Sequence, residues 1–210
     1  MRDNIKTFIE TNFFKVRYIF ENTSLNAGEP DNLVPLPNVS FERIHPGNLH
    51  ALDVIYQSEY NENYLTRVRK RVDEPAMWLG FIAQYEEKPA GCFWMLVPKV
   101  GEVLYDSFQV TADMVLFCGA YVAPPYRGKR IYNAMQYHAY KMLTDDFPDR
   151  KLVIIVERGN HSSLKSLLRS RYLTKGGKNY LFKLMGRNIL SLYQIGRAQS
   201  ELQSHHDLVC

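Results

Sequence analysis

The sequence predicts an α/β fold, in which helices flank a β-sheet. Two observations carry this prediction. Short segments rich in β-branched and aromatic residues alternate with segments of helical spacing along 210 residues. One of them, Leu152–Val156, is continuously apolar, as in a strand buried on both faces. An apolar fraction of 46% and a charged fraction of 23% are ordinary for a chain that buries its own core.

The expected elements begin with an extension at residues 1–38. It contains one strand-like segment, Phe13–Phe20, which is aromatic and β-branched, and a proline-rich connector follows it. The core pattern starts with a short alternating strand at Val39–Arg43. Helical spacing then predicts helices at Pro46–Tyr60 and Tyr64–Val72, the first with a proline near its start.

The second half of the chain repeats this alternation. We expect strands at Met77–Gln84, Ala90–Leu96, Met114–Val122 and Leu152–Val156, and helices at Ile131–Leu143 and Ser162–Arg169. Residues 106–110 are ambiguous. Tyr172–Lys175 and Lys178–Met185 are interpreted as two strands joined by Gly176-Gly177. The core domain is therefore expected at 39–186, with a polar tail at 187–210 whose end we expect to be mobile.

The charge is mildly basic, with a formal net charge of +4 and a sequence pI of about 8.9. This balance favours anionic small molecules and does not indicate nucleic acid, because the basic residues are scattered. The densest basic run, Arg67–Arg71, is interpreted as a solvated helix face.

The three cysteines, Cys92, Cys118 and Cys210, are too few and too scattered for a disulfide framework. The first ten residues are charged throughout and contain no apolar segment, and no run approaches the roughly 20 apolar residues of a membrane span. We therefore expect a cytoplasmic protein. No metal site is expected, because His205-His206-Asp207 has no partners at zinc-site spacing.

A candidate phosphate site lies where the predicted strand ending at Val122 meets the helix beginning at Ile131. The first amides of a helix have no acceptors within the helix and lie at the positive end of its dipole. Gly128 allows close backbone approach or a positive φ, and the loop side chains are basic. The alternative is an ordinary strand–loop–helix joint with surface charges, and the spacing alone leaves both interpretations open.

This loop resembles motif A of the GCN5-related N-acetyltransferases, R/Q-x-x-G-x-G/A between a strand and a long helix. The string Pro124-Pro125-Tyr126-Arg127-Gly128-Lys129 is similar to a frequent version of it. Arg127 takes the R/Q position, while Arg130 and Tyr132 stand where the family usually has Gly and Gly/Ala.

A second resemblance follows 33 residues after Arg127. The family has an Asn after its fifth strand, Ala or Ser three residues later, and a short helix that ends near Gly-Phe. Here Asn160 and Ser163 have that spacing, and Arg171-Tyr172 replaces Gly-Phe.

The resemblance implies a mixed, largely antiparallel twisted sheet whose central strands, Met114–Val122 and Leu152–Val156, splay apart. It implies acetyl-CoA as the acyl donor and no metal. The implied cofactor-binding residues are Tyr121, Val122, Arg127, Gly128, Lys129, Arg130, Ile131, Tyr132, Asn160 and Ser163. Of these, Tyr121 and Val122 would bond the pantetheine through main chain, and Asn160 and Ser163 would contact it.

The catalytic groups are less well defined. Leu167 occupies the position of the family's tyrosine acid, and Met114–Val122 carries no carboxylate. The remaining candidates are Glu157, Cys118 and His161, and each has an ordinary alternative: a surface ion pair, a core thiol and a solvated loop side chain. Asp106 and Asp113 are further unranked carboxylates, and a water relay would need none of these groups.

The resemblance thus implies transfer of an acetyl group from acetyl-CoA to a small-molecule amine. The layout is similar to acetyltransferases that act on amino sugars in surface-polysaccharide pathways. The alternative is a degenerate, non-catalytic member that binds acyl-CoA or a protein partner. The sequence leaves a homodimer open.

Overall fold

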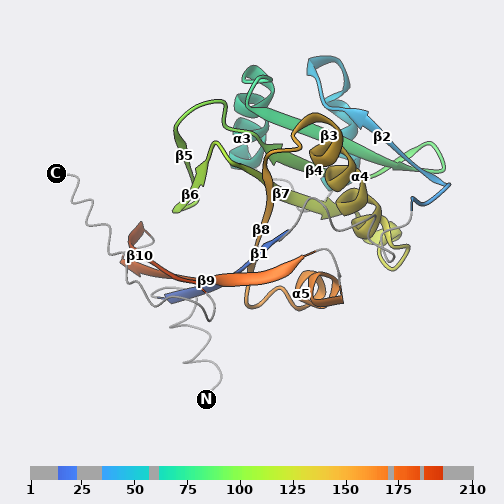
Figure 1. Cartoon of the computed structure of the whole chain (residues 1–210). Helices are drawn as coiled ribbons and strands as arrows, with labels where there is room; N and C mark the ends of the chain where they lie inside the picture. Colours follow the sequence, from blue (N-terminus) through green and yellow to red (C-terminus); the bar gives the residue numbers. More distant parts are fainter. Residues whose placement is uncertain (1–13, 23–34, 57–61, 170–172, 185–186, 196–210) are drawn as a thin grey trace.

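The computed structural model describes residues 14–22, 35–56, 62–169, 173–184 and 187–195. Eight strands form one sheet in the order β10-β9-β1-β8-β7-β4-β3-β2, and β5 and β6 form a separate hairpin (Figure 1). The strands are β1 Phe14–Glu21, β2 Val39–Arg43, β3 Trp78–Tyr85, β4 Lys88–Leu96, β5 Glu102–Tyr105, β6 Phe108–Thr111, β7 Met114–Val122, β8 Lys151–Glu157, β9 Thr174–Leu184 and β10 Arg187–Ile195.

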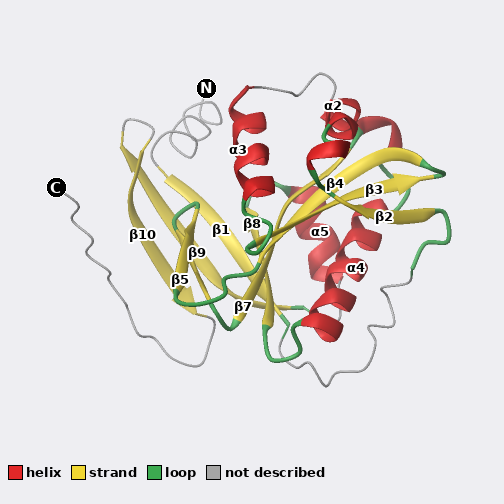
Figure 2. Cartoon of the chain, turned by 90° about the horizontal axis from the view of Figure 1, so that it is seen from above, coloured by secondary structure: helices red, strands yellow, loops and turns green. Residues whose placement is uncertain are grey.

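Helices cover both faces of this sheet. Their bounds are η1 Pro46–Asn48, α2 His50–Tyr56, α3 Glu62–Asp73, η2 Pro124–Tyr126, α4 Ile131–Asp146 and α5 His161–Arg169. In the view from above, α2 and α3 lie on one side of the sheet and α4 and α5 on the other (Figure 2). The predicted mixed, largely antiparallel sheet flanked by helices is confirmed, since β7 with β8 is the one parallel pair among the described strands.

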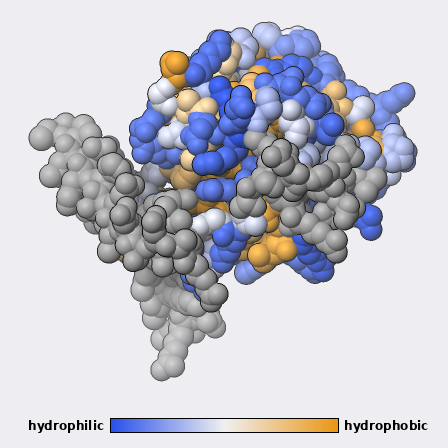
Figure 3. Space-filling view, in the orientation of Figure 1, coloured by the Kyte–Doolittle hydropathy of each residue, from blue (hydrophilic) through white to orange (hydrophobic). Residues whose placement is uncertain are grey.

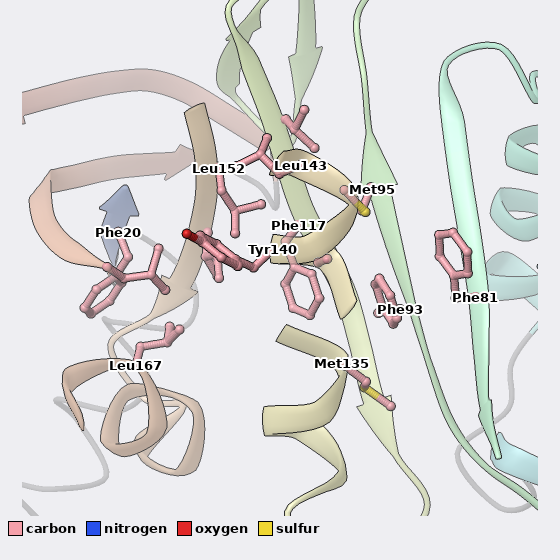
Figure 4. Packing of buried hydrophobic residues seen from close by; sticks show 14 of the residues in the cluster. Phe20, Phe81, Phe93, Met95, Phe117, Met135, Tyr140, Leu143, Leu152 and Leu167 are labelled. Atoms are coloured by element: carbon pink, nitrogen blue, oxygen red, sulfur yellow. The ribbon is translucent and has the colours of Figure 1, made fainter. Parts of the chain in front are cut away.

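Alternation along the strands sorts the core into two main clusters. On β4, Phe93 and Met95 face α4, whereas Cys92 and Trp94 face α2 and α3. The α4 side is the larger and includes Phe117 (Figure 4). A third cluster lies under the β5–β6 hairpin and comprises Ile19, Leu96, Phe108, Val110, Leu116 and Val153. Because side chains alternate along a strand, each strand of the central sheet supplies both layers.

The N-terminal strand lies inside the sheet. β1 pairs antiparallel with β8 on one edge and with β9 on the other. Its neighbouring residues Ile19 and Phe20 are 0% and 1% exposed and belong to different clusters. The predicted strand of the 1–38 extension is therefore a structural link between β8 and β9, and Figure 1 shows it in blue alongside both.

Three details differ from the sequence expectations. β9 is one strand and not two, because Gly176 is accommodated as the extra residue of a bulge where Gly177 pairs with Ile19 and Lys175 with Phe20. A Cβ at Gly176 would lie 3.0 Å from the Glu21 carboxyl carbon. The ambiguous segment is part of the β5–β6 hairpin, and the predicted tail contains β10.

The long helix expected at Pro46–Tyr60 is shorter. It divides into η1 and α2, with His45 capping η1 through its imidazole, and residues 57–61 lie outside the described residues. The surface seen in Figure 3 is mainly hydrophilic over the described residues. Within those residues, no helix is long and apolar enough to cross a membrane.

Candidate functional site

The two central parallel strands separate partway along their length. β7 and β8 pair only from Met114 with Lys151 to Phe117 with Ile154. Beyond that point β7 continues on β4 and β8 continues on β1. No β-ladder hydrogen bonds therefore join the facing backbone edges of the two strands in this part, which are Cys118–Val122 of β7 and Ile155–Glu157 of β8. We call this region the splay. The splaying predicted for these two strands is confirmed.

A β-bulge marks the closed end of the splay. Cys92 pairs with Tyr121 and Trp94 with Cys118, so that two residues of β7, Gly119 and Ala120, stand opposite one residue of β4. Gly119 is exposed and has φ +59°, a conformation that glycine adopts without steric cost. A bulge takes backbone groups out of the regular ladder and makes them available to a ligand.

The loop after β7 presents a row of backbone amides. Arg127 N–H donates to the Pro124 carbonyl, and the amides of Asn133 and Ala134 donate to the Arg130 carbonyl. Within the described chain, no hydrogen bond involves the intervening amides of Gly128 to Tyr132. Five such donors at the start of α4 form a site of positive potential that suits a phosphate.

Two residues of this loop have left-handed backbone. Gly128 has φ +82°, and a Cβ built there would meet nothing within 4 Å. Arg130, the N-cap of α4, has φ +61° and ψ 14°. This conformation favours glycine, and Arg130 stands at a glycine position of the motif. Arg130 therefore holds a backbone conformation that a glycine would adopt without steric cost.

The basic side chains of the loop pack on aromatic rings. Lys129 Nζ lies 4.2 Å from the centroid of Tyr85, and the Arg127 guanidinium lies 5.6 Å from that of Tyr121. Arg127 Nε also donates to the Val122 carbonyl at 3.2 Å. The Val122 carbonyl, part of the main chain at which a pantetheine is expected, therefore already accepts one hydrogen bond from a side chain of the same loop.

The second motif forms the start of α5. Asn160 Oδ1 accepts hydrogen bonds from the Ser163 amide at 3.2 Å and the Ser162 hydroxyl at 3.1 Å, so Asn160 caps this helix. The spacing of Asn160 and Ser163 thus has a structural reason of its own, and contact with a ligand remains a prediction for both.

Helices α4 and α5 are joined across the splay. The Tyr132 hydroxyl lies within hydrogen-bonding reach of Gln136 and Ser163, and Ser166 donates to Asn133 at 3.0 Å. The Tyr132 ring also makes an edge contact with Phe117, the last paired residue of β7, at 6.2 Å between centroids. Burial raises the pKa of Tyr132, so its hydroxyl stays protonated. This bulky residue therefore spans the α4 side of the splay.

The three catalytic candidates from the sequence are not brought together. Glu157 forms an ion pair with Lys15 at 2.6 Å, on the exposed surface. His161 is exposed at the first residue of α5. Cys118 alone lies at the closed end of the splay, where burial raises the pKa of its thiol although nearby Arg71 opposes that shift.

The unranked carboxylates have partners as well. The Asp106 carboxylate accepts a hydrogen bond from the Arg17 side chain. The Asp113 carboxylate accepts a hydrogen bond from the Thr111 hydroxyl and forms an ion pair with Lys151, with 3.2 Å between Nζ and Oδ2. The hydrogen bond from Thr111 is the main reason that the pKa of Asp113 is lowered. Neither carboxylate is a free base. Within the described residues, no group of His, Cys, Asp and Glu could hold a metal ion.

Two residues that the sequence interpretation missed surround Cys118. Tyr105, at the end of β5, hydrogen-bonds to Cys118 and to Arg71 of α3. Burial, and then the neighbouring thiol, raise the pKa of the Tyr105 hydroxyl well above its usual value. Helical spacing could have indicated Arg71, because it lies three residues after the fully buried Val68. The interpretation of Arg67–Arg71 as a solvated face is therefore wrong for Arg71.

Comparison with known proteins gives a likeness of structure only. No protein-family model and no curated protein matches the sequence. A conserved protein of unknown function from Staphylococcus epidermidis superposes with a TM-score of 0.56 at 14% identity, over 86% of this chain and 66% of that one. An acetyltransferase from Colwellia psychrerythraea, of the GNAT (GCN5-related N-acetyltransferase) family, superposes with a TM-score of 0.54 at 14% identity. The superposition covers 86% of this chain and 61% of that one. This chain thus spans less than two thirds of the length of either protein.

The splayed parallel pair, the bulge beside it and these superpositions define the class. The chain has the fold of the GCN5-related N-acetyltransferases.

Proposed function

We propose that this protein is an acyl-CoA-dependent N-acyltransferase that moves an acetyl group from acetyl-CoA to a small-molecule amine. The observation that carries the proposal is the combination of five unbonded amides, Gly128 to Tyr132, with the splay, whose open end is the end of β7 from which their loop leaves. The amides suit a pyrophosphate. An extended pantetheine in the splay would use the backbone edge that β7 does not share with β8.

The chemistry follows from this placement. The phosphates lie at the open end of the splay, so the thioester lies near the bulge at Gly119. The amine nitrogen attacks the thioester carbonyl carbon, the C–S bond breaks, and the amine proton passes to water. Backbone groups freed by the bulge stabilise the oxyanion. The departing thiolate takes its proton from water, because the raised pKa of the Tyr105 hydroxyl beside Cys118 makes that hydroxyl a weak acid.

Binding of CoA is the first test. Titration with CoA or acetyl-CoA should raise the melting temperature progressively and give a heat signal in calorimetry. Absence of both signals at millimolar ligand would overturn the proposal.

A pair of glycine variants locates the phosphate site. Gly128→Val should weaken CoA binding, because its β-branched side chain stands beside the amides. Gly101→Val is the matched control, since Gly101 also has positive φ, +71°, and open space around a Cβ. Both variants should lose similar stability, about 1–2 kcal/mol, while only the first should lose affinity. Equal CoA affinity in the two variants would rule out this loop.

Turnover is the second test. Release of CoA thiol should require an amine and should rise with pH as the amine loses its proton. Amino sugars are the first acceptors to try, because the aromatic N-terminal segment followed by this core is similar in layout to acetyltransferases of surface-polysaccharide pathways. Amino acids, polyamines and peptide N-termini complete the panel.

A second candidate function is binding of acyl-CoA without catalysis. Two observations favour it: Tyr132 spans the α4 side of the splay, and the family's acid position is occupied by Leu167, which is fully buried. CoA binding with no thiol release across the acceptor panel supports this candidate, and amine-dependent release excludes it.

A further inference from the structure

A cationic, aromatic-lined position lies beside the bulge, on the sheet face opposite α4. Arg71 projects from α3 so that its guanidinium carbon stands 4.6 Å from the ring centroid of Trp78 and 5.3 Å from that of Trp94. Its Nη1 lies 3.2 Å from the position of a Cβ at Gly119. The guanidinium therefore lies directly over the exposed bulge.

Arg71 has no acidic partner in the part of the chain that the structure describes. Its guanidinium lies beside the three rings of Trp78, Trp94 and Tyr105 and the thiol of Cys118. Burial keeps both Tyr105 and Cys118 protonated, so neither supplies a negative charge. By contrast, Arg17, whose side chain is 4% exposed, is paired with Asp106.

A buried hydrogen-bond donor that has no partner within the described chain lies next to Arg71. Trp94 is 1% exposed, and its Nε1 is buried without a hydrogen-bond partner in the described residues. Its Cδ1, the carbon bonded to Nε1, is 3.2 Å from the Cβ position at Gly119. The half-buried guanidinium of Arg71 and the indole ring of Trp94, with its unpaired N–H, thus both lie beside Gly119 of the bulge. An unpaired buried polar group is costly, and a bound ligand that accepts its hydrogen bond would remove that cost.

We infer that Arg71 binds an anionic group, a carboxylate or a phosphate, on the acyl acceptor. This inference rests on the proposed function, because it places the acceptor where the thioester would lie. Contact with the rings of Trp78 and Trp94 holds the planar guanidinium. The N–H donors of Arg71 that are not directed at Tyr105 can form two parallel hydrogen bonds to an anion. The acceptor would then be an amino acid or a phosphorylated amino sugar, and a neutral amino sugar would lack the main contact.

Product-like amides test this inference without any need for turnover. Calorimetry with N-acetylglycine, N-acetylglucosamine 6-phosphate and N-acetylglucosamine, each with and without CoA, compares a carboxylate, a phosphate and a neutral ligand. At least one anionic amide should bind roughly 10- to 100-fold more tightly than the neutral one, as expected for a charge-assisted pair. The stronger anionic ligand identifies the source of the charge.

Variants of α3 assign the effect to one side chain. Arg71→Gln should remove the preference for the anionic amide, and Arg71→Lys should restore part of it. Arg69→Gln, which changes an exposed arginine of the same helix, should keep it. Equal binding of neutral and anionic amides, or an anion preference that survives in folded Arg71→Gln, overturns the inference.

The two proposals fail in different ways. If CoA binds but no anionic amide is preferred, the Arg71 inference is wrong and the proposed function stands. If CoA does not bind while the anion preference still depends on Arg71, the anion site stands and the proposed transferase function fails. For variants that bind neither ligand, circular dichroism and the melting temperature separate loss of the site from loss of the fold.

Discussion

Tyr132 is the residue whose identity most affects the candidate donor site. It occupies a position where a small residue would leave the splay open, and its ring reaches from α4 to α5 and packs on Phe117. The sequence alone showed a bulky residue at the Gly/Ala position of the motif that the loop resembles. The structure shows that this residue is held by two hydrogen-bonding neighbours, Gln136 and Ser163.

Replacing Tyr132 separates its effect on stability from its effect on CoA. Tyr132→Ala should destabilise the protein by about 2–4 kcal/mol through lost packing. It should also increase CoA affinity several-fold, because the ring no longer has to move. Tyr132→Phe is the control, since it keeps the ring and loses only the hydroxyl contacts. Calorimetry that shows weaker CoA binding in Tyr132→Ala would mean that the ring contacts the ligand instead of obstructing it.

His138 gives the protein a pH-sensitive core residue. Its ring stacks on Phe41 at 4.3 Å between centroids and meets Phe81 edge-on at 4.9 Å. Its Nε2 is buried without a partner among the described residues. Burial lowers the pKa of His138, because the charged imidazolium loses hydration there that the neutral ring needs less.

The direction of the pH effect follows from that lowered pKa. Above about pH 7.5 the imidazole is neutral in both states and contributes no pH dependence. Below about 6.5, its ordinary pKa, the unfolded chain takes up a proton that the folded protein does not, and stability falls as pH decreases toward the folded pKa. The contribution is at most about 1.4 kcal/mol per pH unit. Denaturant unfolding of wild type and His138→Phe at pH 5.5 and 7.5 measures it. Identical pH dependence in both proteins would contradict this account.

At the scale of elements, the β5–β6 hairpin is fixed by residues from distant strands. Arg17 of β1 donates to both the carbonyl and the carboxylate of Asp106, and Ser191 of β10 donates to the Ser107 carbonyl at 3.0 Å. The turn itself has left-handed backbone at Asp106 and Ser107, with φ +47° and +65°. Since Tyr105 precedes this turn, Arg17 also positions the hydroxyl that lies against Cys118.

Asp106→Asn tests this tether. Asparagine tolerates left-handed backbone as well as aspartate does, so the turn should persist. The side chain of Arg17, which is 4% exposed, would lose its counter-charge. The expected loss is about 1–2 kcal/mol, less than for a fully buried pair because Asp106 is half-exposed. Asp145→Asn is the control, since its pairing with Lys141 at 3.8 Å lies on the surface. If urea unfolding gave the same loss of unfolding free energy for Asp106→Asn and Asp145→Asn, the Arg17–Asp106 pair would stabilise the protein no more than a surface ion pair does.

At the scale of the whole molecule, β1 holds two parts of the sheet together. In the order β10-β9-β1-β8, removal of β1 would separate β9 and β10 from the remaining strands. It would also remove Ile19 and Phe20 from two core clusters. The boundary between an extension at 1–38 and a domain at 39–186 therefore does not mark a separable piece.

Deleting residues 1–38 should abolish cooperative unfolding. Thermal melts followed by circular dichroism should show a sharp transition for the full chain and none for the truncated one. Adding a synthetic peptide of residues 12–23 should restore part of the transition, because the missing strand can pair in trans. A truncated chain that melts like the full one and binds CoA would show that β1 is dispensable.

The sequence by itself determined the local elements of this protein. Val39–Arg43 and Met114–Val122 were predicted with the bounds that the structure gives, and the helices beginning at Ile131 and near Ser162 were also found. The loop at Arg127 to Tyr132 was predicted to be an anion site from its place between a strand and a helix, and anion binding there stays a prediction. These features depend on short-range periodicity, on prolines and glycines, and on helix ends, which a sequence displays directly.

Only the tertiary structure decided which residues meet at the bulge and how the splay is bounded. Arg71, Tyr105 and Cys118 come from three elements, and no spacing in the sequence connects them. The place of β1 between β8 and β9, and the reach of Tyr132 to α5, are likewise long-range contacts. The physical reason is that strand pairing and side-chain packing join segments far apart in the chain, and local propensity carries no information about the partner.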